Sequence, residues 1–445
     1  MAEAETVDAV VIGANIRGLV ATYVLSMLGY RAVLIERAPF VGGVDGSFKT
    51  SDGNWFEYGM HVLDFGRSEA ATKLFTHIVD GKVHRVRLKR GIVLRNHIMP
   101  YAPDPAEMPD EFRKMLPPGE LLDEIGDELP TRARLSEIYG EDYANMIFDE
   151  TLPSLPTENR HRAFGVDEAQ LLTNIYPWFF PRARRKAIAG DESRDYHDKL
   201  RNRVDQFILY PQEGGFGGFS QGFVKKFHPE RIEVLTDARD MEIAVEPGTH
   251  RISAVTALGR QFVAKNYFWG ASWAQLCALL DLPCQNTATD LIMIGSFRLN
   301  REANTSYNEI LFGDPNLRLN RVYFPASFRE SNDPLLQIDY AVPRAENPST
   351  DPEFWQRVWM EDLKRVGILD AEHHVEMFDY KTNAMHFNSY GMEGERLVDA
   401  DPSLIRSDSN VRPLTPSMAN LNLNSHIPRN IAYVTSILAT PPVHD

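Results

Sequence analysis

The chain has 445 residues, of which 43% are hydrophobic and 24% are charged, and these are the proportions of a folded globular protein. Its length exceeds what one compact core holds, so we expect two domains. The formal net charge of -15 argues against a nucleic-acid surface, because a phosphate backbone requires a cationic footprint.

Hydropathy and cysteine usage give further exclusions. No apolar run is long enough to span a bilayer, and the acidic start leads directly into an apolar strand, so we expect neither an integral membrane segment nor a signal peptide. The two cysteines, Cys277 and Cys284, fall outside any metal-ligand pattern and suit a reducing compartment. We therefore expect a cytoplasmic protein without a metal site. The sequence leaves its oligomeric state open.

Residues 8–36 have the pattern of a strand, a helix and a second strand. Asp8–Ile12 is a short β-branched run that stops at Gly13, as a buried parallel strand does before a tight turn. Leu19–Leu28 has apolar residues at helical spacing, and the next strand, Ala32–Ile35, ends on Glu36. An acid about 20 residues beyond a glycine turn is typical of a dinucleotide-binding unit.

The turn reads Gly13-Ala14-Asn15-Ile16-Arg17-Gly18. A helix that starts here directs unpaired N–H groups and the positive end of its dipole at a pyrophosphate, while Glu36 accepts from a ribose hydroxyl. Asn15 stands where a second glycine is usual, and its side chain either offers an amide to a phosphate or crowds it. Arg17 can pair with a phosphate. A βαβ unit without a ligand is the alternative.

The residues after the second strand indicate which dinucleotide is bound. The run from Glu36-Arg37 to Gly42-Gly43, with Ser47 and then Tyr58-Gly59-Met60-His61, resembles the flavoprotein superfamily of amine oxidases, protoporphyrinogen oxidase, phytoene desaturase and UDP-galactopyranose mutase. The resemblance implies FAD as cofactor, with the paired glycines leaving room for it. Within the superfamily, Gly59-Met60-His61 is most similar to a mutase segment that carries a histidine beside the flavin. His61 is therefore our candidate catalytic residue, and a structural histidine is the alternative.

The resemblance also implies an α/β fold. We expect a Rossmann-like FAD-binding domain, with a central parallel sheet and a β-meander, and a substrate domain of mixed α+β structure. The FAD-binding domain would take residues 1–80, 205–288 and a truncated last part, 426–445. The substrate domain would take residues 81–204, with a hairpin and helices, and 289–425, with a mixed sheet.

The middle of the chain contains fewer signals. Glu69–Val79 has the spacing of a helix, and the alternation from Lys82 to Pro100 predicts a hairpin that turns near Lys89-Arg90-Gly91. The aromatic run before Arg182 resembles the segment above the substrate pocket of mutase-like proteins, so Trp178 and Arg182 are substrate candidates. Aromatic core packing and a solvated basic helix face are the alternatives.

Around residue 210 the superfamily returns to its cofactor domain. Gly214-Gly215 would pass near the flavin, although a flexible loop is the alternative. The strands that follow, with a helix over Trp273–Leu280, would complete the cofactor sheet, and the backbone at Ala238 would hold the adenine.

The last third is rich in predicted strands, with an amphipathic helix over Phe354–Val366. Arg321 and Tyr340 are substrate candidates by residue type, and a structural role is the alternative for each. The last cofactor-domain strand is expected at Ile431–Val434, which places Thr435 beside the cofactor. The superfamily has a glycine and a full helix after this strand. With the strand at Ile431–Val434, both are missing.

The leading hypothesis is an FAD-dependent oxidoreductase that acts on a small-molecule substrate. One alternative is a redox-neutral mutase that uses reduced flavin on a nucleotide sugar. The other is a binding protein that has kept the fold and lost the chemistry.

Overall fold

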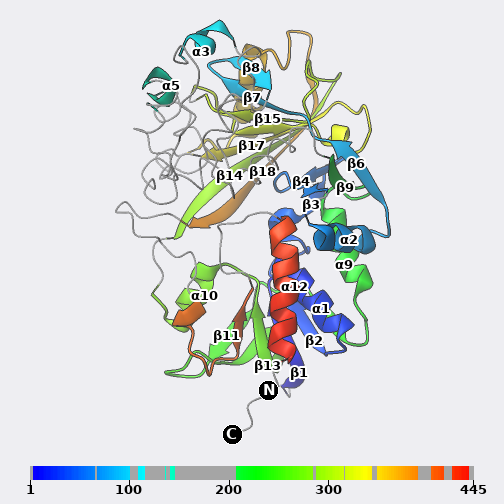
Figure 1. Cartoon of the computed structure of the whole chain (residues 1–445), viewed down its shortest axis with the longest axis vertical. Helices are drawn as coiled ribbons and strands as arrows, with labels where there is room; N and C mark the ends of the chain where they lie inside the picture. The colour runs from blue at the N-terminus through cyan, green and yellow to red at the C-terminus, as the bar shows by residue number, and fades with distance from the viewer. Residues whose placement is uncertain are drawn as a thin grey trace, which may run out of the picture. The chain divides into compact units, whose positions relative to one another are not determined.

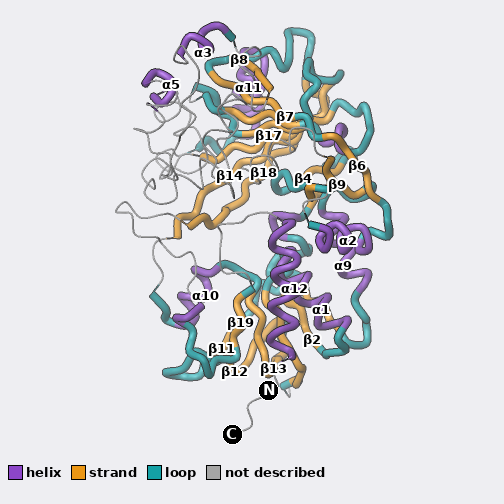
Figure 2. Tube along the Cα trace, in the orientation of Figure 1, coloured by secondary structure: helices purple, strands orange, loops and turns teal. Residues whose placement is uncertain are grey.

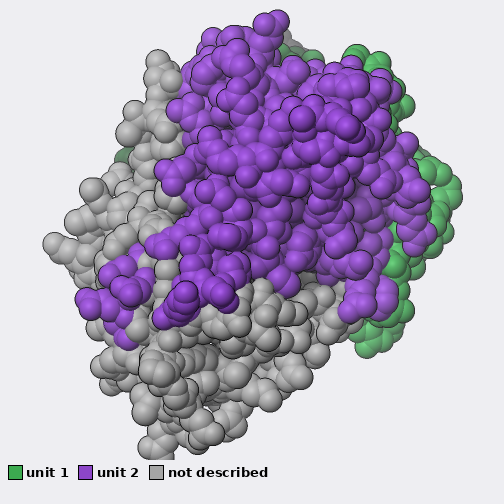
Figure 3. Space-filling view, turned by 90° about the horizontal axis from the view of Figure 1, so that it is seen from above, with its two compact units in different colours: residues 1–85, 208–287, 398–445 green, residues 86–207, 288–397 purple. Residues whose placement is uncertain are grey.

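A computed structural model of the chain describes residues 4–65, 68–100, 109–115, 136, 141–145, 207–283, 287–314, 316–342, 348–388, 402–414 and 423–439. The chain forms two compact units, which Figure 3 distinguishes by colour. Unit 1 comprises Met1–Arg85, Ile208–Thr287 and Val398–Asp445, and unit 2 comprises Val86–Phe207 and Ala288–Leu397.

Unit 1 is built on a sheet with a parallel half and a meander half. Its strand order is β10 (Ile232–Leu235), β2 (Ala32–Ile35), β1 (Glu5–Ile12), β13 (Arg260–Trp269), β12 (Ile252–Ala257) and β11 (Glu242–Val245). The first four strands are parallel, whereas β12 and β11 form an antiparallel meander. A short strand, β19 (Val411–Pro413), lies parallel to the end of β13. The expected Rossmann-like sheet with a β-meander is confirmed.

Helices cover both faces of this sheet (Figures 1 and 2). On one face, α10 (Trp273–Leu280) buries Leu276 and Leu280 in a cluster with Val10 and Val33. The other helices are α1 (Ile16–Met27), α2 (Glu69–Ile78), α9 (Gly217–Lys226) and α12 (Leu423–Ala439). Helix α1 packs against both α9 and α12, so the C-terminal helix lies beside the first helix of the chain.

The hairpin predicted over Lys82–Pro100 is only partly correct. Strand β6 (Val83–Arg87) pairs with β9 (Phe207–Pro211), which also pairs with β5 (Leu63–Asp64). The hairpin is formed by β7 (Arg90–Leu94) and β8 (His97–Pro100), and it turns at Arg95 and Asn96, whose φ angles are 46° and 63°. The turn predicted at Lys89–Gly91 is wrong. That prediction relied on Gly91 as a turn residue, whereas the observed two-residue turn uses Asn96, a residue type that tolerates positive φ.

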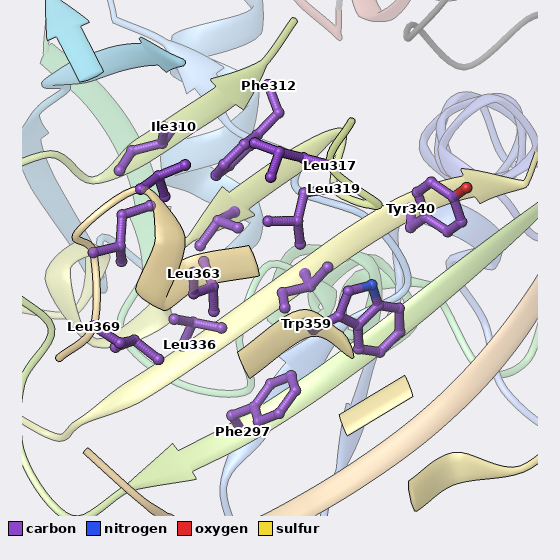
Figure 4. Close-up of a cluster of buried hydrophobic side chains, with 14 of the residues drawn as sticks. Phe297, Ile310, Phe312, Leu317, Leu319, Leu336, Tyr340, Trp359, Leu363 and Leu369 are labelled. Carbon is purple, nitrogen blue, oxygen red and sulfur yellow. The ribbon is translucent and has the colours of Figure 1, made fainter. Parts of the chain in front are cut away.

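Unit 2 contains a mixed sheet. Its strand order is β18 (Val375–Asn388), β14 (Thr287–Leu299), β17 (Leu335–Val342), β16 (Arg321–Tyr323), β15 (Glu309–Phe312), β7 and β8. Helix α11 (Pro352–Arg365) places Trp355, Trp359 and Leu363 in the core on one face (Figure 4). The short helices α3 (Asp110–Met115) and α5 (Glu141–Asn145) also belong to this unit.

Unit 1 ends differently from our expectation. Residues 431–434 lie inside α12, so the strand predicted at Ile431–Val434 is wrong. Its β-branched and aromatic residues favoured a strand, but Ile427, Asn430 and Val434 recur at helical spacing and are buried. The strand that ends the parallel set is β19, which comes earlier in the chain. A helix therefore does follow the last strand.

Within the part of the chain that the structure describes, no helix combines the length and the apolar character needed to cross a membrane.

Candidate functional site

The turn between β1 and α1 brings the helix close to the strand. Gly13 has φ +94°, and a Cβ atom there would lie 3.0 Å from the backbone nitrogen of Ala271. A Cβ atom on Gly18 would lie 1.8 Å from the carbonyl oxygen of Gly13, which no side chain can accommodate. These two glycines are therefore required by the packing of α1 on the strand that precedes it.

Asn15 caps the N-terminus of α1. Its Oδ1 accepts hydrogen bonds from the backbone N–H groups of Arg17, at 3.1 Å, and Gly18, at 3.3 Å. Its Nδ2 donates to the carbonyl oxygen of Gly270 at 2.7 Å. The carboxamide thus occupies two of the donors that we expected to face a pyrophosphate.

Glu36 lies at the carboxyl end of β2 and faces the same turn. One carboxylate oxygen accepts the N–H group of Ala14 at 2.7 Å, and the other accepts that of Ala38 at 2.8 Å. An ionised carboxylate offers about four acceptor positions, so about two remain for ribose hydroxyls. The neighbouring Arg37 is exposed.

The Gly42-Gly43 loop lies directly beside the start of α1. The N–H group of Gly42 donates to the carbonyl oxygen of Ala14 at 2.7 Å, and a Cβ atom on Gly43 would lie 3.3 Å from that of Asn15. Both glycines have positive φ, which L side chains rarely adopt. A Cβ on Gly42 would lie 2.9 Å from the hydroxyl of Ser220, which is fully buried and has no hydrogen-bond partner among the described residues.

The second glycine pair is held against the hairpin of β3 (Ser47–Lys49) and β4 (Trp55–Glu57). The hydroxyl oxygen of Ser47 accepts the N–H group of Gly217 at 2.7 Å, and a Cβ atom on Gly215 would meet that hydroxyl at the same distance. The buried carboxylate of Glu57 accepts from the N–H group of Phe216, at 2.9 Å, and from the hydroxyl of Tyr210. The loop that includes Gly214-Gly215 is therefore built into unit 1.

The segment Gly59-Met60-His61 joins the same region through Asp45. His61 Nδ1 lies 2.8 Å from the carbonyl oxygen of Gly59, and because a carbonyl only accepts, we assign the proton to Nδ1. The other ring nitrogen, Nε2, lies 3.4 Å from a carboxylate oxygen of Asp45, which is only 5% exposed. Met60 is buried.

Two further cationic or titratable side chains, Arg17 and His426, complete the region. Burial lowers the pKa of Arg17, and the nearby carboxylate of Asp45 acts in the opposite direction. Burial, followed by the charges of Arg17 and Arg429, lowers the pKa of His426 to about 4. Nδ1 of His426 has no hydrogen-bond partner among the described residues. Arg17 thus lies near both Asp45, from the Gly42–Ser47 segment, and His426, from α12.

The two remaining predicted cofactor contacts, Ala238 and Thr435, also belong to unit 1. Ala238 donates its N–H group to the carbonyl oxygen of Glu36 at 3.0 Å and accepts from the N–H group of Met241 at 3.2 Å, so its backbone already has protein partners. Thr435 is exposed on α12, where its hydroxyl donates to the carbonyl oxygen of Ile431 at 2.7 Å. Its placement at a strand end was wrong because residues 431–434 are helical.

Unit 2 contains the predicted substrate residues that the structure describes. The Nε atom of Arg321 donates to a carboxylate oxygen of Asp339 at 3.0 Å, and its Nη1 atom lies 3.9 Å from a carboxylate oxygen of Glu309, so two carboxylates face this guanidinium. Tyr340 lies in the hydrophobic core of unit 2 (Figure 4). Its ring is 5.6 Å from that of Trp355. Trp178 and Arg182 lie outside the described residues. The substrate roles of all four residues stay predictions.

Among the described residues, no group of three or more histidine, cysteine, aspartate and glutamate side chains could hold a metal ion.

Sequence reasoning did not identify Asp45 or His426 as part of this region. Asp45 follows Gly42-Gly43 closely in the chain, so its position near that loop could be predicted from the sequence. His426 had no such signal, because its proximity to Arg17 depends on α12 packing against α1.

Comparisons with known proteins extend the description. Residues 11–78 match the model of the NAD(P)-binding Rossmann-like domain family. A 68-residue stretch is 34% identical to the 15-cis-phytoene desaturase of Narcissus pseudonarcissus, and the match covers 15% of this chain and 12% of that protein. The chain thus matches only about an eighth of the length of this curated relative.

Solved structures are similar over almost the whole chain. The crystal structure of a reduced UDP-galactopyranose mutase superposes with a TM-score of 0.67 at 16% identity, covering 98% of this chain and 94% of that one. A putative protoporphyrinogen oxidase from Exiguobacterium superposes with a TM-score of 0.66 at 14% identity, covering 98% and 99%. At these identities the likeness establishes the fold.

Proposed function

We propose that this chain, which has the fold of the FAD-dependent amine oxidase-like flavoproteins, is an FAD-dependent oxidoreductase that acts on a small-molecule substrate. The observation that supports it most directly is the position of Glu36 beside the β1–α1 turn, with the Gly42-Gly43 loop packed on the start of α1. That arrangement offers a carboxylate to a ribose and a glycine-lined surface to a dinucleotide.

The donor set fits FAD in chemistry and charge. Glu36 retains acceptor capacity for ribose hydroxyls, the buried hydroxyl of Ser220 lacks a partner among the described residues, and Arg17 provides a cation in the first turn of α1. The cap by Asn15 occupies two of the backbone donors at the start of α1.

When bound, FAD supplies hydride-transfer chemistry, and the chain binds and orients it. Glu36 and the Gly42-Gly43 loop would hold the adenosine and diphosphate half, and the loop around Gly215 would limit access of water. We retain His61 as the candidate catalytic residue. Its Nδ1–H group donates to the carbonyl oxygen of Gly59, and its Nε2 atom lies 3.4 Å from the buried carboxylate of Asp45.

The test is direct. Purified protein should show the visible absorbance bands of oxidised flavin, which dithionite should bleach, and the apoprotein should take up about one FAD per chain in a calorimetric titration. His61→Gln should retain FAD but lose most of the rate at which substrate reduces it. A protein that shows no flavin bands and takes up no FAD would instead be a binding protein that has lost the chemistry.

A redox-neutral nucleotide-sugar mutase is the second candidate. It is supported by the similarity of the whole chain to UDP-galactopyranose mutase and by the position of the His61 segment in unit 1. The two activities differ in their need for reduced flavin. Conversion of UDP-galactopyranose only after dithionite treatment would favour the mutase, whereas reduction of the oxidised flavin by a substrate would favour the oxidoreductase.

A further inference from the structure

We propose that Asp45 is a positioning residue for His61 and holds the second proton of its ring, on Nε2. The proposal rests on the proposed function, in which His61 is the candidate catalytic residue, and it describes how that residue acts. With a proton on each ring nitrogen, His61 provides a positive charge instead of an acceptor for a substrate proton.

The backbone of unit 1 brings Asp45 and His61 together. Asp45 is the last residue of a short 3₁₀ helix, and its N–H group donates to the carbonyl oxygen of Gly42 at 3.0 Å. The carbonyl oxygen of the next residue, Gly46, accepts the N–H group of Tyr58 at 3.2 Å, three residues before His61. Backbone hydrogen bonds on both sides of Asp45 therefore hold the acid near the His61 segment.

The ring of His61 faces an acceptor at each nitrogen. Nδ1 lies 2.8 Å from the carbonyl oxygen of Gly59, and a carbonyl oxygen never donates, so Nδ1 carries a proton. Nε2 lies 3.4 Å from a carboxylate oxygen of Asp45. In a neutral ring with its proton on Nδ1, Nε2 would present a lone pair to that oxygen, and the two lone pairs would repel each other. A proton between the two atoms makes the contact attractive.

That proton belongs to Nε2, because an imidazole is a stronger base than a carboxylate. Asp45 is only 5% exposed, and a buried carboxylate is costly unless a cation or a hydrogen-bond donor faces it. The ring of His61 meets that requirement when Nε2 is protonated. Arg17, in the first turn of α1, also interacts electrostatically with this carboxylate. His61 is therefore an imidazolium whose Nε2–H group faces Asp45.

The pair changes what His61 does in the proposed reaction. A general base takes a proton through an unprotonated nitrogen within hydrogen-bond reach. Both nitrogens of this ring face protein acceptors, so His61 acts through its positive charge and its orientation. Such a charge stabilises negative charge that develops nearby during a reaction. In this role Asp45 acts only through the ring.

The first experiment is nitrogen NMR of the apoprotein labelled in its histidine rings, with His61→Gln used to identify the His61 signals. At neutral pH, both ring nitrogens of His61 should have the chemical shifts of protonated sites. In Asp45→Asn the carboxamide can donate to Nε2, so Nε2 should become unprotonated while Nδ1 keeps its proton. Asp45→Glu restores a carboxylate and should restore the Nε2 proton. Glu69→Gln, at an exposed position on α2, is the charge-matched control and should leave the wild-type signals unchanged.

The second experiment measures the reduction potential of bound FAD by dithionite titration against a reference dye. Removal of an anion near a flavin raises this potential, because the reduced form carries more negative charge. In the His61→Gln background, Asp45→Asn removes only an anion. Beside His61 it also removes the positive charge of the ring, so the rise should be clearly smaller there. Circular dichroism of each variant checks its fold.

The outcomes separate the pair from the proposed function. An unprotonated Nε2 in the wild-type apoprotein, or the same Nε2 signal in wild type and Asp45→Asn, would overturn the pair whether or not FAD binds. Equal rises of the potential in both backgrounds would overturn the action of Asp45 through His61. Wild-type protein that takes up no FAD would overturn the proposed function and the part of the pair in flavin chemistry, while the NMR signals would still decide the protonation of His61.

Discussion

The carboxylate of Glu36 accepts a hydrogen bond from the N–H group of Ala14 over 2.7 Å, so the end of β2 holds the turn that starts α1. Its second oxygen accepts from Ala38 in the loop that follows β2. Glu36 therefore stabilises the apoprotein as well as offering acceptors to a nucleotide.

We expect Glu36→Gln to lower the free energy of unfolding of the apoprotein by about 1–3 kcal/mol, because one amide oxygen cannot replace both carboxylate acceptors. Urea denaturation of the apoprotein measures this loss. Glu242→Gln, at an exposed position on β11, is the matched control and should leave the midpoint unchanged. A Glu36→Gln midpoint equal to the control's would show that the two hydrogen bonds add no stability.

The first βαβ unit could be predicted from sequence because its signals are local. The β-branched run before Gly13, the helical spacing after Gly18 and the acid at Glu36 lie within one short segment, and the structure has the strand, helix and strand there. The cap by Asn15 is also a local interaction. Asparagine is a strong N-cap residue, so this cap was also predictable from the sequence.

The sequence-based predictions failed where tertiary packing, rather than local sequence, determines the structure. Ile431–Val434 has strand propensity, but the surface buried on α12 extends from Ile427 to Val434 at helical spacing. The proximity of Arg17 to Asp45 and His426 connects three segments far apart in sequence, and no spacing rule encodes it. Propensity is a weak guide where packing supplies most of the stability of a helix.

His426 should make the stability of unit 1 depend on pH. Its pKa is about 4 in the folded protein, below the ordinary value of 6.5, so between these values the unfolded chain binds a proton that the folded chain does not. The stabilisation is complete above about pH 6.5 and is lost as the pH falls toward 4. At about 1.4 kcal/mol for each pH unit in this window, the loss is up to about 3 kcal/mol.

Urea denaturation of the apoprotein at several pH values from 4 to 7 measures this dependence. His426→Gln removes the titrating group. Between pH 7 and pH 4 its free energy of unfolding should therefore fall by less than that of the wild type, and the difference should equal the loss given above. His228→Gln is the control, because His228 lies at the surface beside Glu230. Parallel curves for wild type and His426→Gln would contradict the prediction.

Gly295 makes room for Trp359 in the core of unit 2. A Cβ atom on Gly295 would lie 2.4 Å from the indole ring of Trp359, closer than any real contact, and that ring is itself fully buried. We expect Gly295→Ala to destabilise unit 2 by about 1–3 kcal/mol, because overpacking displaces neighbouring side chains. Thermal unfolding followed by tryptophan fluorescence measures the effect.

The double variant Gly295→Ala with Trp359→Leu provides the control for Gly295. In the Trp359→Leu background, where the side chain is smaller, the added methyl group has space, so it should cost less than it does beside tryptophan. An equal cost in both backgrounds would mean that the indole does not limit the space at Gly295.

The ion pair between half-buried Arg321 and buried Asp339 should contribute more to the free energy of unfolding than the exposed ion pairs of Arg260. Burial alone would lower the pKa of Arg321, but the nearby carboxylates of Asp339 and Glu309 raise it above its ordinary value. Arg321→Met removes the cation and leaves Asp339 buried without it, which should cost about 3–5 kcal/mol. Arg260→Met removes an exposed cation that bridges Glu5 and Glu233 and should cost about 0–1 kcal/mol.

Arg321→Met combined with Asp339→Leu should recover much of the loss, because it removes the uncompensated charge together with the cation. Chemical denaturation of the four proteins measures all of these differences. The same variants bear on the substrate prediction, since an arginine held by two carboxylates has little net charge left for an anion. Arg321→Met could instead lower the free energy of unfolding no more than Arg260→Met does and abolish substrate binding. In that case Arg321 would be a binding residue, and its contribution to stability would be minor.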